Sequence, residues 1–261
     1  MVESINTDTR KTAPDALFVA IHGDRYDAHE ALETARADVA RGLLVSRPVE
    51  HPAPQILVED TVQALGQLAA SWRDDLSAKV IALTGSNGKT TVKEMLAAIC
   101  SQVGNTCVTQ GNLNNHIGMP LTLLRVRSSD QFAILEMGAN HPDEIDYLTR
   151  IARPHIALLN NAGAAHLEGF GSLEGVAKAK GEIFNGLEDG GVAIINADDG
   201  YADYWLGLNA QRDILTFGTA EGAGVRVISA HPLVLEMSGQ PYPVNFSLLG
   251  KHNALNAAAA A

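Results

Sequence analysis

A short glycine-bearing segment, TGSNGKTT at residues 84–91, contains the residue types that bind phosphate chains. Its candidate nucleotide-binding residues are Gly85, Ser86, Asn87, Gly88, Lys89, Thr90 and Thr91. Backbone N–H groups of such a loop can surround an anion, while Lys89 adds a mobile positive charge and the Thr90 hydroxyl can bind Mg²⁺. The spacing G-x-x-G-K-T is shorter than the general G-x-x-x-x-G-K-[ST] pattern, and glycine turns ahead of helices are often only structural. The lysine and both threonines favour phosphate binding.

Glu136 is a second candidate, because it directly follows the apolar run FAIL. An ionised carboxylate at the end of a buried strand is costly without a cation or hydrogen-bond donor nearby. A strand-end acid beside a phosphate loop commonly binds Mg²⁺. We therefore predict a metal ligand, against the alternative of an ordinary surface glutamate.

Lys180 lies in the middle of an apolar stripe on a predicted helix over residues 174–187. The stripe consists of Val176, Ile183, Phe184 and Leu187, and Lys178 points the other way. A lysine on such a face must find an anion, extend its amine to water or lose its charge. From the residues alone, a paired or extended lysine is the simpler interpretation. A neutral amine could instead take up CO₂ and become a carbamate that binds Mg²⁺.

Four polar loops contain further candidates, each with a structural alternative. His166 follows a predicted strand and could bind metal or phosphate. Asn114 and Asn115 could contact a substrate or make turns. Asn253 and Asn256 could face a purine base or cap a helix. Near the N-terminus, the hydroxyl of Thr9 and the guanidinium of Arg10 suit a diphosphate, although ordinary turn chemistry explains them equally well.

Alternating strands and helices must position these residues. Apolar runs at residues 80–83, 132–135, 156–159 and 192–195 predict strands of a mostly parallel sheet covered by helices. After the first run, Val92, Met95, Leu96, Ile99 and Val103 recur with the helical period. The polar candidates follow the strand ends, where ligands of such sheets gather. Residues 214–217, 225–228, 233–237 and 244–248 are β-rich and predict a ribbon or second sheet.

A separate, small α/β unit is predicted for residues 1–76, and a central P-loop-type domain for residues 77–261. Strands are expected at residues 17–21, 43–45 and 55–58, with a helix at 28–41 and another from Asp60. The polar residues 73–79 are interpreted as a linker.

Composition limits the classes of protein. The chain has 261 residues, 46% of them hydrophobic, which indicates a globular protein. A net charge of -11 argues against nucleic acid as a partner. Only two cysteines, Cys100 and Cys107, are present, and no apolar run approaches the roughly 20 residues that cross a bilayer. We expect a cytoplasmic protein that is not inserted in membranes and is a monomer.

Together the motifs resemble those of the Mur ligase family of peptidoglycan synthesis, most closely the MurF type. The matching segments include TDTRKTAPDALFVAIHGDRYDAH, ALTGSNGKTTVKEM, GNLNNHIGMPLTLLR, EMGANHPDEI, AAHLEGFGSLEGVAKAKGEIF, NADD and LGKHNALNA. They span nearly the whole chain, and the short phosphate loop is normal in this family.

The resemblance implies an ATP-dependent amide ligase that joins D-Ala-D-Ala to UDP-N-acetylmuramoyl-tripeptide through an acyl phosphate. It implies that Lys89 binds the outer phosphates and that Thr90 and Glu136 bind one Mg²⁺. It also implies that His166 and a carbamylated Lys180 bind a second Mg²⁺. Asn253 and Asn256 would face adenine. The first unit would bind the UDP group, with Thr9 and Arg10 as contacts, while Asn114 and Asn115 would approach the activated end of the substrate.

The family pattern also contains a C-terminal domain and an N-terminal strand and helix that this sequence does not match. We therefore expect a fragment with weak or absent ligase turnover. The alternatives are a folylpolyglutamate-type amide ligase or a nucleotide-binding module without catalysis. A GTPase is disfavoured, because the sequence has no N-K-x-D motif.

Overall fold

A four-stranded parallel sheet forms the core of the N-terminal unit. The computed structural model describes residues 2–11, 13–23, 26–32, 40–164 and 167–261. The strand order is β1-β2-β5-β6, with bounds Ser4–Asn6, Ala16–Val19, Gly42–Val45 and Gln55–Leu57. The last three confirm the predicted strands, and β1 is a short edge strand that its polar sequence did not reveal. The unit also contains the 3₁₀ turn η1 (Thr9–Lys11), the hairpin β3 (His22–Gly23) with β4 (Tyr26–Asp27), and α1 (Ala28–Ala31). Residues 33–39 of the predicted first helix lie outside the described residues.

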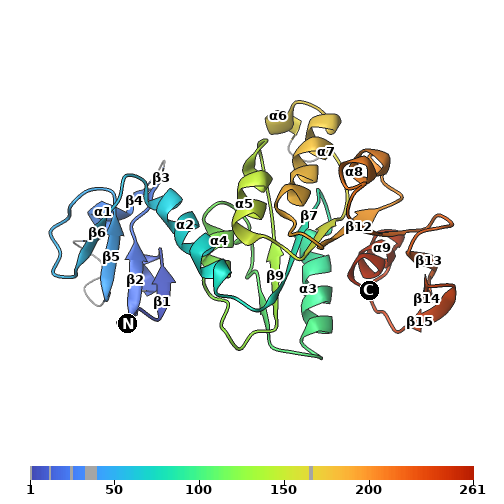
Figure 1. Cartoon of the computed structure of the whole chain (residues 1–261), viewed down its shortest axis with the longest axis horizontal. Coiled ribbons are helices and arrows are strands. Elements are labelled where there is room, and N and C mark those ends of the chain that lie inside the picture. The colour runs from blue at the N-terminus through green and yellow to red at the C-terminus, as the bar shows by residue number, and fades with distance from the viewer. Residues whose placement is uncertain (1, 12, 24–25, 33–39, 165–166) are drawn as a thin grey trace.

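Helix α2 (Thr61–Asp74) joins the small sheet to the rest of the molecule (Figure 1). Asp60 is its N-cap, as predicted, and its carboxylate accepts hydrogen bonds from two backbone N–H groups of the first turn. The helix packs against α4 (Gly118–Leu123) and α5 (Glu144–Ala152). The prediction of a polar linker from residue 73 is therefore wrong at its start, since the Arg73 side chain is buried and bonds to carbonyl groups after α5.

A nine-stranded sheet carries the rest of the chain. The strand order is β15-β14-β13-β12-β11-β10-β7-β9-β8. Seven strands run parallel: β7 (Lys79–Thr84), β8 (Thr106–Val108), β9 (Phe132–Glu136), β10 (Ile156–Leu159), β11 (Val192–Asn196), β12 (Asp213–Gly218) and β13 (Val225–Ala230). The four apolar runs predicted as strands are confirmed.

The β-rich C-terminal segments continue this same sheet, so the predicted alternative of a second sheet is wrong, while that of a ribbon holds for the last two strands. Strand β12 pairs with β11 in parallel, whereas β14 (Leu233–Met237) pairs antiparallel with both β13 and β15 (Gln240–Val244), and β14 with β15 forms a terminal ribbon. The last strand also precedes the predicted residues 244–248. Its Pro241 and Pro243 are tolerated because β15 is an edge strand with an unpaired side.

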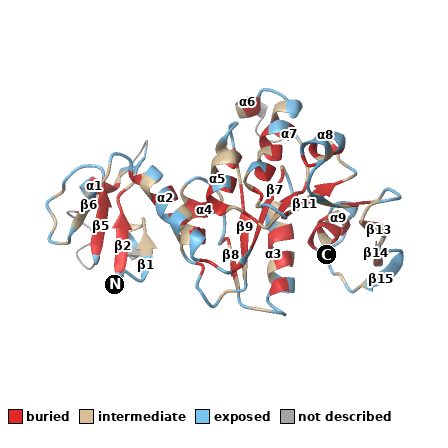
Figure 2. Cartoon of the chain, in the orientation of Figure 1, coloured by how far each residue is buried: buried red, intermediate tan, exposed pale blue. Residues whose placement is uncertain are grey.

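Two helical layers cover the central sheet, and burial concentrates between the layers (Figure 2). On β7, Val80 and Ala82 face the layer of α4, α5, α7 (Leu173–Gly181), the 3₁₀ turn η3 (Glu182–Gly186) and α8 (Ala202–Leu208). The alternate residues Ile81 and Leu83 face α3 (Lys89–Cys100) and α9 (Lys251–Ala260). The short helix α6 (Leu167–Phe170) precedes α7. The sheet is therefore buried on both faces, which explains its continuous apolar runs.

Helix α3 differs from its predicted apolar face. Val92, Leu96 and Cys100 are buried at the spacing i, i+4, i+8, whereas Ile99 is 50% exposed and Val103, beyond the helix end, is 70% exposed. The buried side of the helix also includes Lys93, which is 1% exposed. The apolar spacing thus predicted the helix correctly but assigned two exposed residues to its buried face.

Candidate active site

The phosphate-loop segment lies at the centre of the large sheet. Strand β7 sits between β9 and β10, and the chain reaches these two strands on opposite sides of β7. In open α/β sheets, ligands bind at such a switch point, beyond the carboxyl ends of the strands. Residues 85–88 occupy this position, and α3 starts at Lys89 directly after them. The N-terminus of α3 therefore points its free N–H groups at the place predicted for phosphate.

Polar groups from neighbouring strands hold the loop in shape. The Ser86 N–H donates to the Asn161 carbonyl (3.0 Å), and the Asn87 N–H donates to Asn161 Oδ1 (2.9 Å). Asn160 Nδ2 donates to the Asn87 carbonyl and to Asn256 Oδ1, each at 3.0 Å. The loop is therefore fixed by the end of β10 and by α9.

Only glycine, which has no side chain, fits at position 88 of the loop. Its φ is +78°, a left-handed conformation, and an added Cβ would lie 2.5 Å from Asn256 Oδ1 and 2.7 Å from Asn160 Nδ2. Asn256 is buried beside the loop, and its Nδ2 donates to Asn253 Oδ1 at 3.4 Å. The two asparagines predicted to face adenine are thus joined to each other, and one of them contacts the loop. Asn253 Nδ2 also donates to the Leu249 carbonyl, but neither asparagine caps the helix, because Gly250 is the N-cap of α9.

Lys89 folds back on the loop that precedes it. Its Nζ donates to the Gly85 carbonyl at 2.6 Å and to the Ser86 carbonyl at 3.3 Å. Burial lowers the pKa of Lys89, and the charge of Glu136 partly opposes this shift. The amine is therefore held at the loop by two backbone carbonyl groups.

Glu136 and Thr90 come together beside the loop, as predicted for a metal site. The Thr90 hydroxyl donates to Glu136 Oε2 at 3.2 Å, and Asn114 Nδ2 donates to Oε1 at 2.8 Å. These oxygen ligands fit Mg²⁺, which is usually bound by one or two carboxylates together with substrate phosphates. Among the described residues, no group of three or more His, Cys, Asp and Glu side chains could hold a metal ion alone. The residues present thus suit an ion that a phosphate chain completes.

Lys180 is buried in α7, at the position its apolar stripe predicted, with 2% of its surface exposed. Its Nζ lies 5.7 Å from the centroid of the Phe170 ring. Burial lowers the pKa of Lys180 to about 8, with a further lowering from the charge of Lys89, while Glu144 and Glu182 raise it. Lys178 is exposed on the other face and pairs with Glu174 at 2.7 Å. Lys180 therefore carries its proton less firmly than an ordinary lysine.

A cavity of about 260 Å³ adjoins these groups, with Lys89, Asn114, Asn115 and Glu144 among the residues in its wall. The Asn115 side chain accepts hydrogen bonds from the N–H groups of Ile117 and Gly118, at the start of α4. Asn114 therefore faces the carboxylate, whereas the Asn115 oxygen serves a turn.

The remaining predicted residues are His166, Thr9 and Arg10. His166 lies outside the described residues. Thr9 and Arg10 lie in η1 of the N-terminal unit, where the exposed Arg10 side chain donates two hydrogen bonds of 2.9 Å to the half-buried carboxylate of Asp8. Sequence reasoning missed Lys93 and did not assign Asn160, although the strand-end position of Asn160 was a usable signal.

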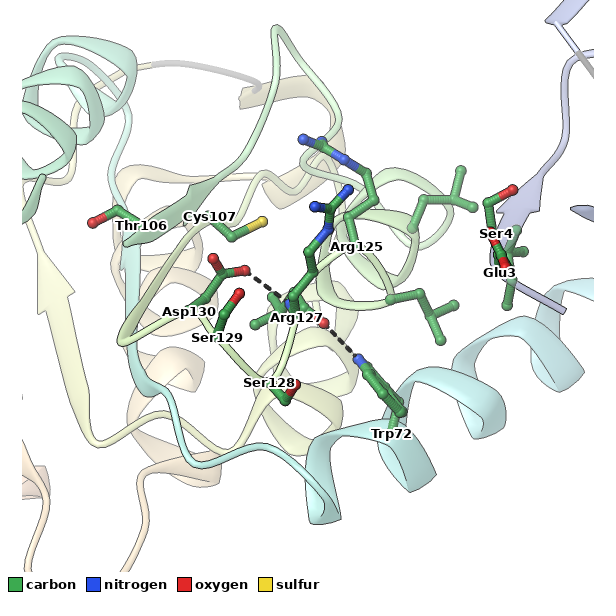
Figure 3. Close-up of a pocket in the computed structure, with 14 residues that line it drawn as sticks. Glu3, Ser4, Trp72, Thr106, Cys107, Arg125, Arg127, Ser128, Ser129 and Asp130 are labelled. Carbon is green, nitrogen blue, oxygen red and sulfur yellow. Dashed lines mark hydrogen bonds between the residues drawn. The ribbon is translucent and has the colours of Figure 1, made fainter. Parts of the chain in front are cut away.

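A hollow of about 710 Å³ lies away from the phosphate loop. It separates Glu3 and Ser4 of the N-terminal unit from Arg125, Arg127 and their neighbours after α4 (Figure 3). None of the predicted site residues lines it.

Comparisons with known proteins agree with this arrangement. The curated UDP-N-acetylmuramoyl-tripeptide–D-alanyl-D-alanine ligase of Escherichia coli is 48% identical, covering 100% of this chain and 59% of the relative. The ligase of that name from Bacillus subtilis is 37% identical, covering 100% and 58%. Among solved structures, MurF from Acinetobacter baumannii matches with a TM-score of 0.93 at 39% identity, covering 99% of this chain and 58% of that one. MurF from Thermotoga maritima in complex with ADP matches with a TM-score of 0.85 at 29% identity, covering 99% and 62%.

The chain thus spans about three fifths of the length of these relatives. No helix among the described residues combines the length and apolar character needed to span a bilayer. Residues 83–261 match the Mur ligase middle domain, which includes the phosphate loop, Glu136 and Lys180. The chain therefore belongs to the Mur ligase family.

Proposed function

We propose that this chain contains the ATP-binding and substrate-binding parts of an ATP-dependent ligase that joins D-Ala-D-Ala to UDP-N-acetylmuramoyl-tripeptide. The observation that carries the proposal is the meeting of Lys89, Thr90, Glu136 and Asn114 at the switch point of the sheet. Residues 77–261 would bind ATP, and residues 1–76 would bind the UDP group, with Thr9 and Arg10 as contacts.

The reaction proceeds in two steps. The terminal carboxylate of the tripeptide attacks the γ-phosphorus of ATP, which forms an acyl phosphate and releases ADP. The amine of D-Ala-D-Ala then attacks the acyl carbon, and the tetrahedral intermediate expels phosphate as the amide forms. Both steps develop negative charge on oxygen, which cations at the site stabilise.

The residues of this chain have separate tasks in that reaction. Lys89 exchanges its carbonyl partners for the β- and γ-phosphates. Mg²⁺, held by Thr90 and Glu136, would neutralise phosphate charge. Asn114 orients the carboxylate of Glu136. Gly85, Ser86, Asn87, Gly88 and Thr91 complete the phosphate site, Asn253 and Asn256 bind adenine, and Asn115 approaches the activated substrate.

A second Mg²⁺ would be held by His166 and a carbamylated Lys180. The lowered pKa of Lys180 supports this assignment, because only the neutral amine adds CO₂, losing a proton as the carbamate forms. The mass of one CO₂ on the native protein, absent from the K180M variant, is the expected result. We further expect a cytoplasmic monomer.

Calorimetric binding tests the proposal directly on this chain. Lys89→Ala should weaken binding of Mg-ATP by roughly 10- to 100-fold, the cost of losing a charge-assisted hydrogen bond, without changing binding of UDP-N-acetylmuramoyl-tripeptide. Lys178→Ala removes a lysine that faces solvent and should change neither affinity. A chain that binds neither ligand, or an unchanged ATP affinity in the Lys89 variant, would refute the proposal.

A further inference from the structure

Lys93 is a buried cation whose amine meets three oxygen atoms. It lies in α3, one turn after Lys89, and its side chain is 1% exposed. Its Nζ lies 3.2 Å from Glu94 Oε1, 3.4 Å from the Gly111 carbonyl and 3.8 Å from Glu136 Oε2. Burying an ammonium group costs several kcal/mol unless anions compensate it. The position therefore requires a specific electrostatic partner.

Glu136 is the buried member of this group. Its side chain is 3% exposed, whereas that of Glu94 is 64% exposed and well hydrated. The side chains that donate hydrogen bonds to the Glu136 carboxylate, Thr90 and Asn114, are neutral. Within the described residues, Lys93 is the only cationic side chain within 4.0 Å of that carboxylate. Lys93 is thus the nearest cation to the buried charge of Glu136, which Lys89 influences only from beyond ion-pair distance.

The same lysine also fixes a loop of the site. Gly111 begins the segment that ends in Asn114, and the Lys93 amine donates to the Gly111 carbonyl. Asn114 in turn donates to Glu136 Oε1, while Lys93 approaches Oε2 of the same carboxylate. Lys93 therefore contacts both the carboxylate and the start of the loop that orients it.

We propose that Lys93 is a positioning residue that serves as the counter-ion of Glu136 until a divalent cation binds. The inference rests on the proposed function for the metal role of Glu136. A metal held by Thr90 and Glu136 would use Oε2, the oxygen that both Thr90 and Lys93 approach. Because like charges repel, the amine then shifts toward Glu94 Oε1, which is already the nearer anion.

Two consequences separate this role from ordinary packing. Lys93 keeps the metal ligand in place before the metal arrives, so its loss should destabilise the metal-free protein. Lys93 also competes with the metal for Glu136, so its loss should strengthen metal binding. A lysine that only packed would produce the first effect without the second.

The test titrates metal ions both alone and with ATP, because the residues of the site suit an ion that a phosphate chain completes. Lys93→Met keeps the length of the side chain and removes its charge. We expect it to bind Mn²⁺ about ten-fold more tightly by paramagnetic resonance titration, to melt at a lower temperature without metal, and to gain more than the wild type from MgCl₂. Lys93→Arg should retain wild-type behaviour in all three measurements. Glu94→Gln, which removes the second anion, should weaken Mn²⁺ binding.

A double-mutant cycle in metal-free buffer tests the ion pair independently of any metal or ligase activity. Glu136→Gln alone leaves the lysine without its buried anion and with only the exposed Glu94 as an ionic partner. The double variant K93M/E136Q removes both buried charges, so it should be more stable than the sum of the single effects predicts. If K93M alone does not fold while the double variant does, the coupling is equally demonstrated. Additive effects, or Mn²⁺ binding by K93M that is unchanged or weaker, would overturn the proposal. A wild type that binds no Mn²⁺, alone or with ATP, would refute the metal role of Glu136 in the proposed function. It would also refute the competition between Lys93 and the metal, and the double-mutant cycle would then test only the ion pair.

Discussion

Replacing Gly88 with alanine tests whether this residue holds the phosphate loop in a conformation that only glycine allows. The backbone has a φ of +78°, and the new Cβ would lie 2.5 Å from Asn256 Oδ1 and 2.7 Å from Asn160 Nδ2. Those two atoms share a hydrogen bond of 3.0 Å that joins β10 to α9. Alanine must therefore either separate the two amides or change the loop itself.

The expected cost has two parts. A left-handed conformation costs an L-residue about 1–2 kcal/mol. Breaking the amide pair leaves two buried polar groups unsatisfied, which adds roughly 1–3 kcal/mol. We therefore expect Gly88→Ala to lower the free energy of unfolding by about 2–5 kcal/mol in total.

Gly190 provides a matched control, because its φ is +74° and a Cβ there would meet nothing within 4 Å. Gly190→Ala should cost only the backbone part, about 1–2 kcal/mol. Urea unfolding of both variants gives the difference, and calorimetric titration with Mg-ATP should show at least ten-fold weaker binding for Gly88→Ala alone. Equal unfolding costs in the two variants, or unchanged nucleotide affinity in the Gly88 variant, would show that the amide contacts do not constrain the loop.

Two further predictions concern buried cations. The buried Arg73 guanidinium donates to the Ala152 and Arg153 carbonyls at 2.8 Å and pairs with Glu188 at 3.0 Å. Arg73→Met should therefore lower the free energy of unfolding in urea by about 3–5 kcal/mol. A loss below about 1 kcal/mol would contradict a stabilising role for these contacts. The pKa of Lys180 is about 8 in the folded chain against 10.5 ordinarily, so the unfolded chain holds more protons between those values and wild-type stability rises with pH across that window. In buffer depleted of CO₂, where Lys180 keeps a free amine, Lys180→Met should gain up to about 3 kcal/mol near pH 7 relative to wild type, a gain that disappears by about pH 10.5. A gain that does not change with pH would refute this linkage.

Local patterns in the sequence predicted the individual strands and helices better than they predicted which strands pair with one another. The strands at residues 80–83 and 132–135 were recognisable because both faces of the sheet are covered, which makes each run continuously apolar. The order of the strands depends on contacts between distant segments, so the merging of β12 and β13 into the main sheet was not visible. Lys180 was recognisable because it interrupts an apolar stripe. Lys93 was not, since it borders the stripe of α3, and only the folded chain shows that β9 brings Glu136 to it.

Lysines gather at the site although the chain as a whole carries a net negative charge. A net charge of -11 repels nucleotides and UDP-linked peptides at long range, yet Lys89, Lys93 and Lys180 gather around the end of the central sheet. Each of these amines is at least partly buried, and the charge of Lys89 lowers the pKa of Lys180. A group of buried, positively charged amines is stable only where carboxylates such as Glu136, Glu144 and Glu182 compensate the charge. Attraction for phosphate therefore depends on short-range, desolvated contacts at the end of the central sheet. Removing a carboxylate there should disturb the lysines as much as removing a lysine disturbs the carboxylates.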